Sequence, residues 1–438
     1  MTHLGGGSSS SYLLERAWVD GAVCDEVLVE IEDGRFTTVV PRNSSLDDEA
    51  SSSRREFHRP ADEPSRLPGL TLPGLANDHS HAFHRALRGR TQRERGTFWT
   101  WREQMYDVAG RLTPDGYFAL ARATYREMVA AGYTSVSEFH YLHHRPDGSP
   151  HDHPNAMGEA LVAAAAEAGI RITLLDTCYL SSGFGAPPEG VQRRYSDGTA
   201  AAWAERAGDG PAAIHSVRAV PRDQLAVFRG RAPLHVHLSE QVAENQACLA
   251  AYGVTPTRLL HDEGLLGPDT TVVHATHLTD DDIALLGGTR TNVCITPTTE
   301  RDLADGIGPA RRLAEAGCRV SIGSDSHAVV DPFEELRGLE MDERLATQER
   351  GHWTAAELLA VGTPRRIAVG EPADLVTIDT RSPRTAGTGA DEHTAVYAAT
   401  AADVTHVVVG GRPVHTAADV EQIGRELDRA MGDLWPAP

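Results

Sequence analysis

Lysine is missing from this chain of 438 residues, and each of its 41 basic side chains is an arginine. Schiff-base catalysis, attachment of pyridoxal phosphate, a P-loop and a carbamylated lysine that bridges two metal ions all need a lysine amine, so these mechanisms are excluded. The net charge of −21 also argues against a nucleic-acid partner, because affinity for a phosphate backbone comes from clustered cations.

Cysteine is scarce and long apolar runs are absent. No stretch of about 18 apolar residues occurs, and the Gly/Ser-rich residues 1–11 lack the basic and then apolar pattern of a secretion signal. We therefore expect a cytoplasmic protein that does not enter a membrane. An odd number of widely spaced cysteines without a C-x-x-C pair is typical of reduced thiols. They are Cys24, Cys178, Cys248, Cys294 and Cys318.

Between residues 70 and 344, short β-rich runs alternate with longer runs rich in Ala, Leu, Glu and Arg, as in repeated βα units. A doubly wound open sheet would carry a glycine fingerprint after its first strand, but Ala76-Asn77-Asp78-His79 stands there instead. The pattern therefore predicts an α/β fold with a closed, TIM-like (β/α)8 barrel. The eight expected strands lie near residues 70–75, 135–139, 172–175, 213–217, 234–238, 271–274, 292–295 and 319–322.

Strand-like alternation also occurs at both ends of the chain, at residues 12–40, 374–378 and 406–409. We expect these segments to form one small composite β-sandwich domain, while residues 43–65 form an exposed linker. The predicted organisation has three parts. Residues 1–66 hold the first part of the β domain and the linker, residues 67–365 the barrel, and residues 366–438 the rest of the β domain and a terminal helix.

Polar side chains that can bind a metal follow several of the expected strands. His79 and His81 flank one residue after the first, and a strand backbone points both imidazoles to the same side. On its own such a pair occurs by chance about as often as by function. Three further strand ends carry His237, His274 and Asp325, and the C-terminal ends of barrel strands all face one mouth, where active sites of this fold lie.

These residues, together with Glu240, resemble the mononuclear metal-dependent hydrolases of the amidohydrolase superfamily. The resemblance implies that His79, His81, His237 and Asp325 bind one divalent metal ion. Three imidazoles and a carboxylate favour Zn²⁺, although Fe²⁺ or another borderline ion suits the same donors. The missing lysine excludes the lysine-bridged binuclear subtype of the superfamily.

Five further segments are similar to the N-formimino-L-glutamate deiminase family of histidine degradation, namely residues 77–87, 98–106, 138–144, 215–220 and 273–277. The resemblance implies hydrolysis of N-formimino-L-glutamate to N-formyl-L-glutamate and ammonia, and a homodimer. Glu240, His274 and Asp325 would serve catalysis: Asp325 accepts a proton from water, His274 stabilises the developing charge or orients the nucleophile, and Glu240 carries a proton to the leaving nitrogen.

The same resemblance implies that Arg102, Tyr141, His215 and Arg218 recognise the glutamate portion of the substrate. An arginine fork binds a carboxylate in two places at once, so two arginines suit a dicarboxylate amidine. His84 departs from the family pattern, because many members have Gln at this position. It is predicted to contact the substrate, and its different reach and charge bear on which substrate is preferred.

Two other functions remain open at this stage. The same metal chemistry could deaminate a ring amidine of the cytosine, guanine or triazine type, whose pocket would need amide donors and stacked aromatic rings. A non-catalytic metal-binding scaffold is the other alternative. The presence of Glu240, His274 and Asp325 together argues against the scaffold. The histidine-rich residues 140–154 are interpreted as a solvated loop rather than as a second metal site.

Overall fold

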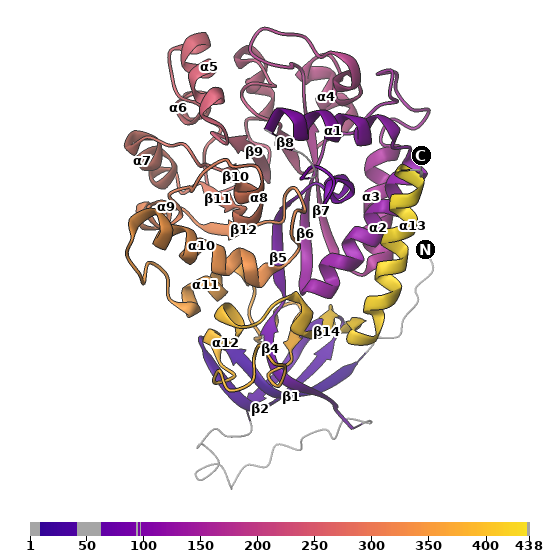
Figure 1. Cartoon of the computed structure of the whole chain (residues 1–438), viewed down its shortest axis with the longest axis vertical. Helices are drawn as coiled ribbons and strands as arrows, with labels where there is room; N and C mark the ends of the chain where they lie inside the picture. Colours follow the sequence, from indigo (N-terminus) through magenta and orange to yellow (C-terminus); the bar gives the residue numbers. More distant parts are fainter. Residues whose placement is uncertain (1–8, 42–62, 93–94, 97, 436–438) are drawn as a thin grey trace.

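The computed structural model describes residues 9–41, 63–92, 95–96 and 98–435, and these ranges hold every element named below. The chain forms a barrel of parallel strands with a helical outer layer, and a curved sheet lies beneath it (Figure 1). Among the helices of the described ranges, none combines the length and the apolar character that a membrane crossing needs.

The barrel contains eight parallel strands in the order of the sequence, which confirms the predicted fold class. It closes where the last strand meets the first, because Asp325 N–H donates to His79 O at 3.0 Å and His81 N–H donates to Asp325 O at 3.3 Å. The strands are β5 (Leu75–Ser80), β6 (Tyr133–His140), β7 (Arg171–Cys178), β8 (Ala212–Ile214), β9 (Leu234–Leu238), β10 (Thr270–His274), β11 (Asn292–Ile295) and β12 (Val320–Ile322).

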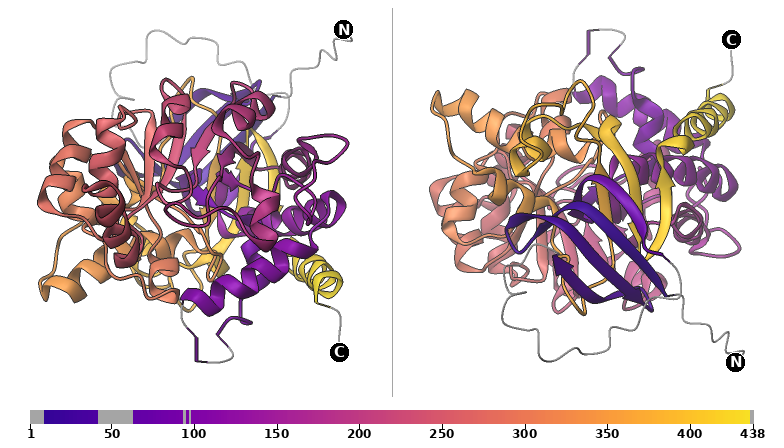
Figure 2. Two further views of the ribbon diagram at one scale, coloured as in Figure 1. Left: turned by 90° about the horizontal axis from the view of Figure 1, so that it is seen from above. Right: turned by 90° about the horizontal axis from the view of Figure 1, so that it is seen from below.

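Helices surround the barrel, as the view from above shows (Figure 2, left). Thr113, Thr199 and Thr279 accept backbone N–H groups at the starts of three of them, as expected for N-cap residues. The α-helices are α1 (Phe98–Arg111), α2 (Pro114–Ala131), α3 (Ala156–Ala168), α4 (Ala200–Ala207), α5 (Val242–Tyr252), α6 (Pro256–Asp262), α7 (Asp280–Gly288), α8 (Pro297–Asp302), α9 (Ala310–Ala316), α10 (Pro332–Thr347), α11 (Ala355–Gly362), α12 (Glu392–Tyr397) and α13 (Val420–Leu434). Short 3₁₀ helices are η1 (Ala82–Leu87), η2 (Gly190–Tyr195), η3 (Arg222–Phe228), η4 (Ala401–Asp403) and η5 (Ala417–Asp419).

The second sheet is assembled from both ends of the chain, as predicted. Its seven strands have the order β15-β14-β13-β4-β1-β2-β3, and the N-terminal and C-terminal strands lie side by side in the view from below (Figure 2, right). The members are β1 (Ser10–Val19), β2 (Ala22–Glu32), β3 (Arg35–Pro41), β4 (Ser65–Pro73), β13 (Leu375–Ile378), β14 (Val404–Val409) and β15 (Arg412–Thr416).

The two layers of the expected sandwich belong to this one curled sheet. The start of β3 reaches the segment before β13, where Phe36 N–H donates to Glu371 O at 3.1 Å and Gly370 N–H donates to Phe36 O at 2.8 Å. Apolar side chains from both ends of the chain, including Leu14, Val29 and Leu375, are buried between the halves. The curl therefore gives the sheet a core of its own.

One predicted strand was assigned to the wrong sheet. The run at residues 70–75 was expected to open the barrel, but it lies in β4 of the curled sheet, and the barrel begins with β5. Gly74 separates the two strands, and a Cβ there would stand 2.3 Å from Thr134 Oγ1. Alternation of apolar residues indicates a strand but not its partner, so the sequence could not distinguish the two sheets. Most of the predicted linker at residues 43–65 lies outside the described residues.

Candidate metal and substrate site

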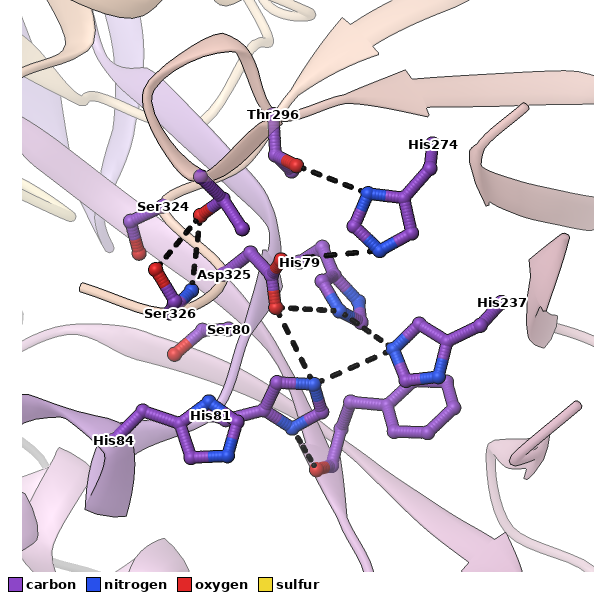
Figure 3. A network of polar contacts seen from close by, with 12 residues as sticks. His79, Ser80, His81, His84, His237, His274, Thr296, Ser324, Asp325 and Ser326 are labelled. Carbon is purple, nitrogen blue, oxygen red and sulfur yellow. Dashed lines mark hydrogen bonds and ion pairs between the residues drawn. The ribbon is translucent and has the colours of Figure 1, made fainter. Parts of the chain in front are cut away.

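The four predicted metal ligands come together at the C-terminal mouth of the barrel (Figure 3). His237 Nε2 lies 3.1 Å from His79 Nε2 and 3.3 Å from His81 Nε2. Asp325 Oδ1 lies 3.4 Å from each of the two Nε2 atoms of His79 and His81. All four side chains are at most 9% exposed. They reach this point from β5 and the residue directly after it, from β9 and from the residues after β12.

This donor set fits a metal ion. His81 Nδ1 lies 2.9 Å from Phe139 O, and His237 Nδ1 lies 2.9 Å from His215 O, so each Nδ1 donates its proton and each Nε2 directs a lone pair inward. Burial lowers the pKa of both rings, which favours the neutral form that metals bind. A tetrahedral ion with bonds of about 2.0–2.1 Å holds its ligand atoms about 3.3–3.4 Å apart, close to the distances seen here.

The backbone at these strand ends adopts conformations that local sequence does not favour. Ser239, His274, Ala275 and Asp325 have φ angles of 52°, 70°, 51° and 36°, in the left-handed region. Such residues cost of order 1–3 kcal/mol each and cluster at active sites. Gly323 allows the end of β12 to approach β5, because a Cβ there would stand 2.7 Å from His79 O. Tertiary packing therefore turns these side chains into the mouth.

The two further catalytic candidates lie beside the metal-ligand group. His274 Nε2 is 3.8 Å from Asp325 Oδ2, and Glu240 lines the same cavity. Burial disfavours a charge on His274, but Glu240, Glu300 and Asp325 raise its pKa to about 10. Burial raises the pKa of Glu240. The acids and His274 thus form one buried group in which the charge of each side chain affects the pKa of the others.

A cavity of about 70 Å³ lies in front of this group and opens to solvent. This is several times the space that one water molecule needs, so a small ligand can enter it. All of the residues predicted to bind substrate line it, although they come from distant parts of the sequence. They are His84, Arg102, Tyr141, His215 and Arg218.

The two arginines occupy different surroundings in this cavity. Arg102, on α1, donates from Nε to Tyr106 Oη, which also accepts a proton from Gln192 Nε2 at 2.8 Å. Within the described ranges Arg218, which follows β8, has neither a hydrogen bond nor an ion pair. A half-buried guanidinium without a partner is suited to bind an anion.

His84 is buried against the rings of the site. Its Nε2 is 3.1 Å from Tyr141 Oη, and its ring centroid is 4.6 Å from that of His81 and 5.2 Å from that of Trp101. Burial and the neighbouring imidazoles lower its pKa well below the usual value, so the ring is neutral. It therefore joins the metal-ligand group to the aromatic wall of the cavity without adding a charge.

Sequence reasoning missed several residues of the cavity. Met105 and Tyr106 belong to a segment that the resemblance already singled out, so their positions were a usable signal. The others follow loops or short helices with no motif of their own, and only the folded chain brings them together. The missed lining residues are Met105, Tyr106, Tyr179, Tyr195, Leu303 and Ser326.

The histidine-rich segment differs from the predicted solvated loop. His143 and His144 are only 1% and 6% exposed. His143 Nε2 donates to Thr177 O at 2.8 Å, and His144 Nε2 lies 3.1 Å from Asp197 Oδ1. Periodicity gives no sign of such pairing across loops, and so the sequence suggested exposure. Within the described ranges, the segment contributes no residue to a group of metal-ligand geometry.

The family profile of the Amidohydrolase family matches residues 70–414. The chain therefore belongs to the amidohydrolase family. Formimidoylglutamate deiminase of Pseudomonas aeruginosa is 35% identical over 417 residues, which cover 85% of this chain and 91% of that protein. This similarity confirms the resemblance that the sequence segments indicated.

Two solved structures share the fold. An amidohydrolase from Brucella melitensis superposes with a TM-score of 0.83 and 29% identity, over 97% of this chain and 99% of that one. An adenosine deaminase from Xanthomonas campestris, solved with bound zinc, gives a TM-score of 0.77 and 22% identity over 96% and 98% of the two chains. The combination of a (β/α)8 barrel and a composite sheet is thus common to this group of enzymes.

Proposed function

We propose that the chain is a zinc-dependent hydrolase that converts N-formimino-L-glutamate and water to N-formyl-L-glutamate and ammonia. The observation that carries this proposal is the presence of Arg102 and Arg218 in the same cavity as the metal-ligand group. A linear amidine with two carboxylates can place one carboxylate at each guanidinium while its formimino carbon faces Asp325 and Glu240. The similarity to formimidoylglutamate deiminase supports the same substrate.

The residues divide the chemistry among them. A divalent ion held by His79, His81, His237 and Asp325 supplies the activation of water at neutral pH. Asp325 accepts the proton of the attacking water. His274 faces Asp325 and stabilises the charge that develops when water adds to the formimino carbon.

Glu240 carries the proton that the leaving group needs. Burial raises the pKa of its carboxyl group, which favours the protonated form close to the reacting atoms. As the carbon–nitrogen bond breaks, Glu240 delivers this proton to the terminal nitrogen, which leaves as ammonia. The terminal =NH group needs two protons to become ammonia, and the second is the one that Asp325 took from water. The water oxygen stays on the carbon, and its remaining proton passes to Glu240 as the formyl C=O forms, so both water protons are accounted for and Glu240 is protonated again.

A deaminase of a ring amidine is the second candidate. The observation that favours it is the aromatic wall of the cavity, on which a flat ring could stack. The arginines argue against it, because a neutral ring offers no counter-charge to the guanidinium group of Arg218. The aromatic residues are Trp101, Tyr106, Tyr141, Tyr179 and Tyr195.

The test is ammonia release by purified protein of known metal content. N-formimino-L-glutamate is compared with its diamide, in which both carboxylates are neutral, and with cytosine and guanine. We expect turnover of the diacid, with at least a 100-fold lower kcat/KM for the diamide, of the order expected when two charged pairs are lost. Faster turnover of a ring substrate, or equal turnover of diacid and diamide, would refute the proposal.

A further inference from the structure

We propose that Glu300 is a positioning residue that acts through Thr296 to hold His274 in its working orientation. This inference rests on the proposed function, since it assigns a role within that same site. Glu300 belongs to α8 and does not line the cavity. It therefore reaches the chemistry only through the residues between it and the metal-ligand group.

The three residues form a buried chain. His274 Nδ1 lies 3.2 Å from Thr296 Oγ1 (Figure 3). Glu300 Oε1 accepts Thr296 N–H at 3.0 Å and lies 3.4 Å from Thr296 Oγ1 and 3.5 Å from His274 Nδ1. The exposed fractions of His274, Thr296 and Glu300 are 1%, 0% and 4%, so water does not replace these contacts.

Hydrogen-bond directions follow from the single hydroxyl proton of Thr296. A carboxylate only accepts, so Thr296 Oγ1 donates its proton toward Glu300. Its lone pairs are then left to accept the proton on His274 Nδ1. The contacts among these three residues therefore hold a proton on His274 Nδ1 and turn Nε2 toward Asp325 and the cavity. Without an acceptor at residue 300 the Thr296 hydroxyl can rotate, and the hydrogen bond that orients His274 Nδ1–H is weakened.

A second buried carboxylate, Glu335 of α10, shows what a purely structural role looks like. Glu335 Oε2 accepts Thr298 N–H at 3.1 Å, and Glu335 Oε1 accepts the Thr298 hydroxyl at 2.5 Å. Glu335 is fully buried, like Glu300, and does not line the cavity. It also holds a threonine at the start of α8. Only Glu300 continues the contact to a histidine of the site.

This pair allows a matched experiment. Glu300→Ala removes the acceptor, Glu300→Gln keeps an oxygen acceptor without the charge, and Glu335→Ala is the control. We expect Glu300→Ala to lower kcat about 10- to 100-fold, as outer partners of catalytic histidines do. KM and metal content should change little, Glu300→Gln should recover most of the activity, and Glu335→Ala should lose stability but keep kcat within about threefold.

Two results would overturn the inference. The first is a kcat for Glu300→Ala within about threefold of the wild-type value in folded, metal-loaded protein. The second is an equal loss of kcat in Glu300→Ala and Glu335→Ala, which would mean that any buried acid that holds the start of α8 has the same effect. The thermal midpoint and the metal content of each variant are measured beside the kinetics, so that unfolding is recognised.

A spectroscopic measurement separates this inference from the proposed function. In protein labelled with ¹⁵N-histidine, the ring signals of His274 are assigned by their loss in His274→Asn. We expect a protected Nδ1–H in the wild type and in Glu335→Ala, and its loss in Glu300→Ala. An unchanged signal in Glu300→Ala refutes the inference. If N-formimino-L-glutamate is not the substrate, the signal still reports on the positioning of His274.

Discussion

The two sides of the cavity are built in different ways. On one side, the metal-ligand side chains stand at strand ends and are at most 9% exposed. Two of them, His81 and His237, also donate a hydrogen bond from Nδ1 to a backbone carbonyl. On the other, Arg102 and Arg218 stand on a helix and a loop and are half-buried. From this difference in burial and support we expect the metal-ligand side to be the more rigid one and the arginine side the more adaptable one.

The largest effect is expected at the rigid side. His237→Asn removes an inward-facing nitrogen from the donor set, and the amide cannot reach the position of Nε2. We expect metal content to fall well below stoichiometric and kcat to fall by more than about 10⁴-fold, because water is then no longer activated at neutral pH. Metal analysis and ammonia release check this. Retention of both properties would contradict the assigned ligand set.

The substrate side should respond in binding rather than in metal content. Arg218→Met removes a half-buried guanidinium from the cavity, and we expect kcat/KM for the diacid to fall about 10²- to 10³-fold, mostly through KM. Arg222→Met is the matched control, because Arg222 pairs with Glu263 on the surface and is 42% exposed. Its kcat/KM should stay near the wild-type value. A full loss of metal in Arg218→Met would show that the two sides are not separate.

The buried carboxyl group of Glu244 makes the free energy of unfolding depend on pH. Glu244 is 6% exposed, and its Oε1 atom has no hydrogen-bond partner within the described ranges. Burial raises its pKa from 4.5 to about 7, with Arg218 opposing and Glu240 adding to the rise. The folded form therefore holds the proton more tightly than the unfolded form, and the wild type loses stability as the pH rises from about 4.5 through 7.

Glu244→Gln is neutral at every pH and lacks this loss. We expect the variant to gain about 2–3 kcal/mol in free energy of unfolding, relative to the wild type, between pH 5 and pH 8. Denaturant unfolding at both pH values measures it, with the exposed Glu159→Gln as a control that should show no such gain. An equal difference between variant and wild type at both pH values would contradict the assignment.

The smallest effect is expected where the two sides meet. His84→Gln introduces the residue that many members of the family have, and Gln can still bond with Tyr141 Oη. We expect kcat/KM for the diacid to change less than about tenfold, which corresponds to about 1.4 kcal/mol. Comparing the diacid with a one-carbon-shorter analogue tests whether His84 sets the depth of the cavity. A larger loss than that of Arg218→Met would reverse the ranking of the two sides.

The sequence was sufficient to predict which four side chains form the metal-ligand group and which residues of the family motifs line the cavity. His79 and His81 share a strand end, and the predicted strand positions already brought His237 and Asp325 to the same mouth. The arginines were found through their motifs and not through any periodicity. Short-range patterns thus identify residues whose role depends on a strand end or on a motif.

Other features depended on contacts between distant segments. The sequence indicated the strand at residues 70–75 but not its partners, because apolar alternation is the same in either sheet. It suggested an exposed loop for His143 and His144, whose partners lie beyond residue 176. Tyr179 and Tyr195 reach the cavity through loops that carry no pattern.

By itself, the amino-acid sequence determined which chemical groups are available. It has no lysine, it places three imidazoles and a carboxylate at the ends of predicted strands, and it places two arginines within the family motifs. The tertiary structure decided how these groups act. It closed the barrel between β5 and β12, imposed left-handed backbone at His274 and Asp325, and placed Glu300 behind Thr296. The physical reason is that hydrogen bonds and close packing between segments far apart in the chain set these geometries, and no local preference encodes them.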